Sequence, residues 1–188
     1  LFDGKTLNGW SVHSGYAKYR VEDGTIVGTT VKGSPNTFLC TDREYGDFIL
    51  EFEVMVDPRL NSGVQIRSKI APEELTYWFR NDQGKLYERK VPKDRVHGYQ
   101  VEIAGAEVGA SGGIYDEARR AFKDGQWNKY RVECRGQSMK TWVNGVPTME
   151  IEDAMTGSGI IGLQVHSVRE DSPTLEVRWR NIRLLELK

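Results

Sequence analysis

Apolar and polar residues alternate with a period of two along most of the chain. The clearest case is "DFILEFEVMV" (47–56), in which every second residue from Phe48 to Val56 is apolar. This period predicts a β-strand with one buried face, because successive side chains of a strand point to opposite sides. Further strands of this kind are expected at 62–69, 98–103, 127–136, 159–167 and 174–187.

Two hairpins are marked by turn dipeptides that accept positive φ, Asp23-Gly24 within 19–29 and Asn144-Gly145 within 138–153. A single short helical turn is expected, at 116–123. Many strands without intervening amphipathic helices predict an all-β fold. We predict a two-sheet antiparallel jelly-roll sandwich that forms one domain over residues 1–188. A long insertion at about 70–97 interrupts it, and loops of such length are usually functional or disordered.

Three strands carry polar side chains in pairs on the face opposite their apolar residues. The pairs are Gln65 with Arg67, Gln100 with Glu102, and Gln164 with His166. On adjacent strands ~4.8 Å apart, they would form a polar floor. Amide and guanidinium groups held in one plane can bind several hydroxyls at once, which favours a carbohydrate-sized cleft. The alternative is that each pair lies on an ordinary solvated face.

Several blocks, in order along nearly the whole chain, carry a resemblance to a known family. They are "LFDGKTLNGW", "NSGVQIRS", "GYQVEI", "GGIYDEARR", "WNKYRVECRG", "TWVNGVP", "GIIGLQVHS" and "VRWRNIRLLEL". On these blocks the chain resembles the 3-keto-disaccharide hydrolase family. The resemblance implies a concanavalin-A-like jelly roll, usually in exported proteins, and hydrolysis of the glycosidic bonds of 3-keto sugars. An oligosaccharide or glycoside is therefore the expected partner, and the periplasm, cell surface or medium the expected location.

The chain departs from the family pattern at two places. Many members have Tyr-Glu-Val-Gln where this chain has Tyr-Gln-Val-Glu at 99–102, so the carboxylate and the amide are exchanged. The block "LQVHS" (163–167) also stands where "LQDHG" is common. The histidine fits the family pattern, whereas the position of the acid does not.

The polar floor offers one clear carboxylate, Glu102, and a second acid could come from Asp116 or Glu117 in a glycine-flanked loop. Ordinary glycosidases use two such acids. A 3-keto sugar needs only one base, because its carbonyl acidifies the hydrogen at C2 and the enolate then expels the glycosidic oxygen from C1. His166 would be that base. Arg67 would stabilise the enolate oxygen, and Glu102 would orient the imidazole or protonate the leaving group.

Other side chains are weaker candidates for contact with a sugar. Tyr115 adjoins the glycine-flanked loop, and Trp142 is either a stacking platform or a packing residue of its hairpin. "TYWF" (76–79) is either a sugar-stacking rim or a local hydrophobic plug. His13 and His97 are expected at the surface.

Two further pairs of residues have an expected place in the fold. Glu51 and Glu53 alternate with apolar residues and are expected on a solvated face. Cys40 and Cys134 are expected to be separate core thiols, although they could pair in an oxidising compartment. Trp179 has the parity of a core residue.

Charge and composition exclude several classes of partner. Lys and Arg number 26 against 27 Asp and Glu, for a net charge of −1, so no nucleic-acid partner is expected. No apolar run approaches the ~20 residues of a membrane span. No metal motif and no cofactor signature appear, and a loop calcium of the kind some jelly rolls hold is not located. The chain begins with Leu1 rather than Met, and we expect a removed secretory signal.

Three functions remain open from the sequence. The first is an exported glycoside-cleaving enzyme, and the second is a non-catalytic carbohydrate-binding module on the same scaffold. The third is an interaction domain, which predicts an exposed apolar patch and no polar cleft. Oligomeric state is not predicted.

Overall fold

The computed structural model describes residues 1–80, 83–104 and 121–188, whose strands form two large antiparallel sheets and one two-stranded sheet. The five-stranded sheet has the order β1-β4-β13-β6-β9. Its strands are β1 (Trp10–His13), β4 (Thr37–Thr41), β6 (Asn61–Ile70), β9 (Val96–Ala104) and β13 (Ile160–Val165). The seven-stranded sheet has the order β12-β11-β10-β5-β14-β3-β2. Its strands are β2 (Lys18–Glu22), β3 (Thr25–Thr29), β5 (Phe48–Val56), β10 (Asn128–Arg135), β11 (Ser138–Val143), β12 (Val146–Glu152) and β14 (Glu176–Glu186).

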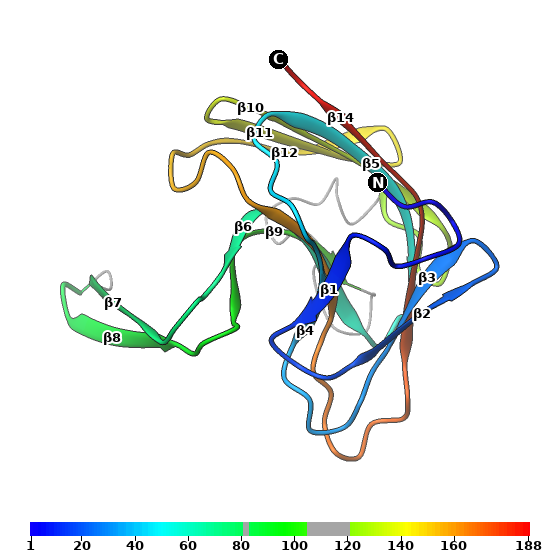
Figure 1. The fold of residues 1–188 in the computed structure, drawn as a ribbon, viewed down its shortest axis with the longest axis horizontal. Coiled ribbons are helices and arrows are strands. Elements are labelled where there is room, and N and C mark those ends of the chain that lie inside the picture. The colour runs from blue at the N-terminus through cyan, green and yellow to red at the C-terminus, as the bar shows by residue number, and fades with distance from the viewer. Residues whose placement is uncertain (81–82, 105–120) are drawn as a thin grey trace.

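The two large sheets face each other across one hydrophobic core (Figure 1). In β5 every second residue from Phe48 to Val56 is buried and the residues between them are not, as the alternation predicts. Val64 of β6 and Leu163 of β13 meet this face from the other sheet, and Trp179 is fully buried, as expected. The predicted two-sheet antiparallel jelly roll is therefore confirmed.

Both predicted hairpins form at their turn dipeptides. Asp23 and Gly24 join β2 to β3 with φ of 48° and 72°, and Asn144 and Gly145 join β11 to β12 with φ of 51° and 84°. Two successive positive φ angles give a turn whose twist matches that of the flanking strands. These turns fix the register of two strand pairs in the seven-stranded sheet.

The two cysteines are free and buried in different sheets, Cys40 in β4 and Cys134 in β10. Burial raises the pKa of Cys40 to about 12 and that of Cys134 to about 11. The expectation of separate core thiols is confirmed.

The expected insertion contains an ordered hairpin rather than a structureless loop. Strands β7 (Leu75–Arg80) and β8 (Leu86–Val91) pair with each other and form the two-stranded sheet. This hairpin, which we call the arm, extends away from the sandwich (Figure 1). It leaves from the end of β6 and returns into β9, and these two strands are neighbours in the five-stranded sheet.

A β-bulge interrupts the β6–β9 pair at the base of the arm. Ile66 pairs with Tyr99, and Lys69 pairs with His97. Between these two pairs β6 therefore has one residue more than β9. Arg67 lies within the bulge and has a φ of 45°, which a non-glycine residue adopts only at a cost of ~1–3 kcal/mol. The strict alternation assumed along 62–69 therefore ends at Ile66.

Candidate functional site

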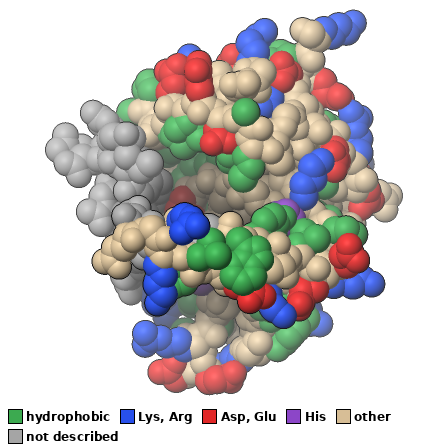
Figure 2. Space-filling view, turned by 90° about the vertical axis from the view of Figure 1, so that its left-hand side faces the viewer, with side chains coloured by type: hydrophobic (Ala, Val, Ile, Leu, Met, Phe, Trp, Pro, Cys, Tyr) green, Lys and Arg blue, Asp and Glu red, His purple; other side chains and the backbone are tan. Residues whose placement is uncertain are grey.

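A cleft of about 1290 Å³ lies on the face of the five-stranded sheet that points away from the core, beside the arm. Figure 2 views this side of the molecule and shows apolar and basic side chains along the arm, with the surface hollowed next to it. The cleft brings together five residues predicted for the site, namely Gln65, Gln100, Glu102, Gln164 and His166. Alternation along β6, β9 and β13 places the first four on this face.

A chain of hydrogen bonds links the floor of the cleft from β6 to β9. The Ser68 hydroxyl donates to Gln65 Oε1 over 2.7 Å, and Gln65 Nε2 donates to Gln100 Oε1 over 2.6 Å. Gln100 Nε2 in turn donates to Glu102 Oε2 over 2.7 Å. The amide groups are therefore oriented in one direction, and each Gln keeps a second N–H for a ligand or for a longer contact such as Gln100 with Gln164, 3.5 Å apart.

Glu102 is held by amide donors on both of its oxygens. Asn61 Nδ2 donates to Oε1 over 2.5 Å, and Gln100 donates to Oε2. Both oxygens of this side chain therefore have an amide donor, which fixes the plane of the carboxyl group. Glu102 is thus an acidic side chain held in a fixed orientation in the floor, and sequence reasoning missed the contribution of Asn61 to holding it.

Gly63 gives the floor its flat surface between Glu102 and Gln164. Its cross-strand partners are Glu102 on β9 and Gln164 on β13, so it is central in that row of the sheet. A Cβ atom at this position would lie 2.7 Å from the amide carbon of Gln100. The absence of a side chain at Gly63 therefore lets the Gln100 amide lie across the sheet.

His166 lies one residue beyond β13 and lines the cleft together with Asn36 and Asn61. Its Nδ1 is 2.8 Å from the carbonyl oxygen of Ser167, which can only accept, so Nδ1 carries the hydrogen. The neutral ring then has its lone pair on Nε2. Asn36 Oδ1 accepts from Ser167 N over 2.9 Å and so fixes the backbone that orients the imidazole.

The expectation that Arg67 lies on this floor is wrong. Its guanidinium is fully buried between the sheets, where it donates to Gly46 O over 2.8 Å, Gly136 O over 2.7 Å and Asp47 Oδ1 over 2.7 Å. The bulge in β6 is the cause, because the added residue turns Arg67 inward. Ser68 takes its place beside Gln65.

The other predicted contacts of the site lie elsewhere or outside the described residues. Trp142 lies on β11 in the seven-stranded sheet, with the Arg131 guanidinium 5.7 Å from its ring centroid, and it does not line the cleft. Tyr115 and Asp116 fall within residues 105–120, which the structure does not describe. Most of the expected helical turn at 116–123 falls there as well.

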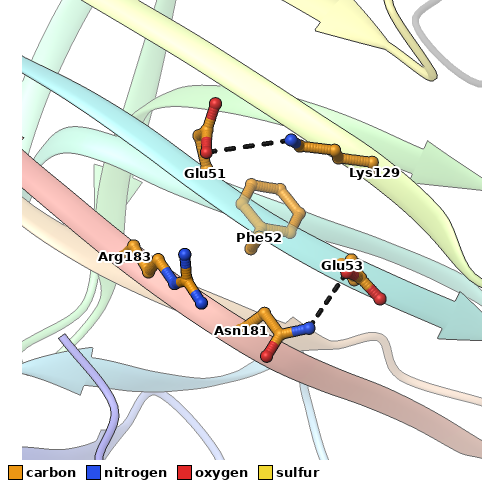
Figure 3. A pocket seen from close by; sticks show the side chains of 6 residues that line it. All are labelled: Glu51, Phe52, Glu53, Lys129, Asn181 and Arg183. Atoms are coloured by element: carbon orange, nitrogen blue, oxygen red, sulfur yellow. Dashed lines mark hydrogen bonds and ion pairs between the residues drawn. The ribbon is translucent and has the colours of Figure 1, made fainter.

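Glu51 and Glu53 lie on the outer face of the seven-stranded sheet, as expected, and not in the cleft. Figure 3 shows them beside a small hollow of about 100 Å³, with Lys129, Asn181 and Arg183 around it. Arg131 lies 3.3 Å from Glu51, and Arg180 lies 2.7 Å from Glu53. Basic neighbours thus neutralise both carboxylates, which makes this surface an ion-pair network.

The arm forms one wall of the cleft, and this wall was not predicted in detail. Tyr77 of β7 lines the cleft, whereas Trp78, the next residue, is 62% exposed. The Tyr77 ring lies 6.2 Å from that of His97, which also lines the cleft although it was expected at the surface. Burial, and then the charge of Arg89, lower the pKa of His97. The proximity of this histidine to the arm could not be seen from its sequence neighbours.

His13 ties β1 to the turn that precedes β9. Its Nδ1 lies 2.5 Å from Asp94 Oδ1, and Ser14 N donates to Asp94 Oδ2 over 3.0 Å. Burial alone would raise the pKa of Asp94, but these hydrogen bonds and the positive charge nearby hold it below its ordinary value. His13 is therefore an anchor for the base of the arm rather than an unattached surface residue.

The described segments contain neither a cluster of metal ligands nor a membrane-spanning helix. Within residues 1–80, 83–104 and 121–188, no group of three or more His, Cys, Asp and Glu side chains is arranged to hold a metal ion. Over the same ranges, no helix has the length and apolar character needed to cross a bilayer.

Comparison with known families decides the assignment that the sequence blocks suggest. The model of the 3-keto-alpha-glucoside-1,2-lyase-like domain matches residues 1–185. The chain belongs to this family. No curated protein matches the chain. The expected family is thus confirmed, and with it a function related to carbohydrates.

Solved structures similar to this family member share its fold at low sequence identity. A protein from Parabacteroides distasonis ATCC 8503, provisionally assigned as a glycosyl hydrolase, has a TM-score of 0.59 and 19% identity over 100% of this chain and 93% of its own. The carbohydrate-binding module CBM66 from Bacillus subtilis has a TM-score of 0.58 and 13% identity over 98% of this chain and 99% of its own. A Bacillus subtilis protein of unknown function with a galectin-like fold has a TM-score of 0.56 and 9% identity over 96% of this chain and 90% of its own. At these identities the likeness supports the jelly-roll fold alone.

Proposed function

We propose that this protein cleaves the glycosidic bond of 3-keto-glycosides in the cleft beside the arm. The supporting observation is that a fixed carboxylate, Glu102, and an imidazole with its Nε2 lone pair available, His166, line the same cleft. Amides between them can bind sugar hydroxyls, and membership of a 3-keto-glucoside 1,2-lyase-like family favours this substrate class.

The proposed chemistry begins with proton removal at C2, next to the ketone at C3. His166 Nε2 would take this proton, and the electron pair of the C–H bond would form an enolate with its charge on the ketone oxygen. The enolate then expels the glycosidic oxygen from C1, which leaves a double bond between C1 and C2. His166 would return its proton to the departing oxygen. Water adds later across the C1–C2 double bond, with its oxygen bonded to C1 and a proton to C2.

Glu102 has a different role in this scheme from that of a proton donor. Because both of its oxygens already accept amide hydrogens, the carboxylate can only accept further bonds, from sugar hydroxyls or from the imidazolium that forms. We therefore propose that Glu102 positions the sugar and stabilises the protonated His166. The enolate oxygen, without Arg67, would rely on amide N–H donors of the floor.

The experiment is to compare wild type with His166→Asn and Glu102→Gln on a 3-keto-glucoside, with product formation and exchange of the C2 hydrogen with deuterated water as readouts. Asn keeps a donor for the Ser167 carbonyl but cannot take a proton, so we expect a loss of ~100-fold or more in both readouts. Glu102→Gln should lower cleavage by a smaller factor. Glu53→Gln, which removes a carboxylate from the outer face of the other sheet, is the matched control and should keep full activity.

Near-wild-type cleavage by both cleft variants would overturn the proposal. The alternative function, a non-catalytic carbohydrate-binding module, is favoured by the amide chain, which could hold a glycan without cutting it. It predicts binding of unmodified and 3-oxidised sugars alike, with neither cleavage nor exchange at C2.

A further inference from the structure

Positive charge is concentrated on the arm side of the cleft. Four lysine or arginine side chains line the cleft over the described part of the chain, against a single carboxylate, Glu102. The four are Lys69, Arg89, Lys90 and Arg95. The whole chain has a net charge of −1, so this excess is local and not a property of the overall composition. A neutral sugar makes no use of such a field.

Over the described residues, two of the four cations have acidic partners and two do not. Lys69 pairs with Glu44 at 2.6 Å, and Lys90 pairs with Glu74 at 3.3 Å. Among the residues that the structure describes, neither Arg89 nor Arg95 forms an ion pair. Arg89 lies opposite Tyr77 on the arm, on the side that lines the cleft. Their guanidinium groups are therefore available to a ligand.

We propose that the cleft binds an anionic glycan, with a carboxylate or sulfate group of the sugar on Arg89 and Arg95. The guanidinium fork matches both anions, since each presents two oxygens in a plane that suits a bidentate contact. The floor amides then bind the hydroxyls of the adjoining sugar, and Tyr77 provides a face for its ring. This inference rests on the proposed function only in taking a glycan as the ligand.

The charge on the arm also acts on the histidine beside it, as a smaller cause than burial. Burial, and then the charge of Arg89, disfavour the protonated form of His97, which lies against Tyr77. An anion seated beside Arg89 would offset this charge and shift His97 towards protonation. Binding should therefore be accompanied by proton uptake, a signature that a neutral sugar would not give.

The experiment measures the affinity of three probes by calorimetry, namely cellobiose, cellobiouronic acid and a 6-sulfated cellobiose. We expect both anionic probes to bind about tenfold or more tightly than cellobiose, and the preference to weaken between about 20 mM and about 200 mM salt. The tighter of the two anions identifies the source of the charge. Arg89→Gln and Arg95→Gln should each reduce the preference, and the double variant should abolish it while cellobiose binding is unchanged.

Arg135→Gln is the matched control, because it removes the same charge from a side chain that is 61% exposed at the end of β10, in the other sheet. It should keep the full preference, and all variants should keep the thermal unfolding midpoint of wild type. Equal affinity for the three probes, binding of none of them, or an equal loss in Arg135→Gln would overturn the inference. Cleavage of a neutral 3-keto-glucoside without a preference for anionic probes would support the proposed function and overturn this inference. A preference for anionic probes without cleavage would support this inference and overturn the proposed function.

Discussion

Substituting Arg67 by Met distinguishes its predicted role as a sugar ligand from its observed place between the sheets. Its guanidinium donates to two backbone carbonyls, of Gly46 and Gly136, and to the Asp47 carboxylate. The side chain is fully buried. Met fills a similar volume and offers no donor, so the substitution removes the polar contacts with little change in packing.

The expected loss follows from the groups left without a partner. Each hydrogen bond from a charged donor is worth ~1.5–3 kcal/mol net, and breaking a buried ion pair typically costs ~3–5 kcal/mol. Asp47 is 39% exposed and still accepts from Gly136 N, so water and the backbone recover part of its loss. We therefore expect the two backbone carbonyls left without a donor to account for most of the loss. The free energy of unfolding should fall by ~3–5 kcal/mol.

Urea unfolding followed by tryptophan fluorescence measures this change. With a slope of ~2 kcal/mol per M for a domain of this size, the midpoint should move down by ~1.5–2.5 M. Below the transition, the affinity of the cleft for a glycan probe should stay within about twofold of wild type, since the guanidinium does not reach the floor. An unchanged midpoint together with a large loss of affinity would refute the structural role and restore the role predicted from strand alternation.

Three further predictions concern the floor, the anchor of the arm and the thiols. Gly63→Ala should displace the Gln100 amide, which its Cβ would meet at 2.7 Å, and so lower glycan affinity with little change in stability. Gly157→Ala is the control, because a Cβ there meets nothing within 4 Å, and it should change neither quantity. Equal glycan affinities of the two variants would contradict this prediction. Asp94 has a folded pKa below 3.8, so its contribution to stability is present above about pH 4 and is lost as the pH falls through the folded value. The difference in urea midpoint between wild type and Asp94→Asn should therefore shrink below about pH 4. A difference that stays constant with pH would contradict this contribution of Asp94. Cys40 and Cys134, with pKa values raised to about 12 and about 11, should react with a thiol reagent at about pH 8 only on unfolding, and rapid labelling of the native chain would contradict their burial.

Alternation and turn chemistry were sufficient to predict the sandwich. Where a strand runs unbroken, as in β5, period two decides which side chains are buried, and the two hairpins formed at the dipeptides that favour positive φ. The same reasoning placed Gln65, Gln100 and Glu102 on one face, because β6 and β9 are regular and adjacent there. These are properties of single strands and their nearest neighbours, which the sequence specifies locally.

The arm and its charges could not be predicted in this way. Whether residues 75–91 form a separate hairpin depends on how β6 ends and β9 begins, and not on any period within the segment itself. His97 meets Tyr77 only because the arm leaves the five-stranded sheet beside the start of β9. Contacts of this kind join segments that are distant along the chain, and neither alternation nor composition reports on them.

One signal for the bulge was present in the sequence and concerns Gly98. A glycine inside a strand pattern often marks a bulge or a close approach of backbone. In the structure Gly98 has a φ of 135° opposite the bulge, and a Cβ there would lie 2.6 Å from the Ser68 hydroxyl. On the other side of the bulge, a Cβ at Gly159 would overlap the backbone of Arg67 and Ser68. Two glycines thus make room for the added residue.

This bulge also decides which element supplies each kind of charge to the cleft. By turning Arg67 inward it leaves Glu102 as the charged group of the floor, within a row of neutral amides. The positive charge that faces a ligand then comes from the arm and the turn after it, through Arg89 and Arg95. Because floor and arm are separate elements, substitutions in the arm should change which glycan binds without changing whether it is cleaved. Under the proposed function, substitutions in the floor should change cleavage for every glycan that binds, so the chemistry and the choice of substrate would vary independently.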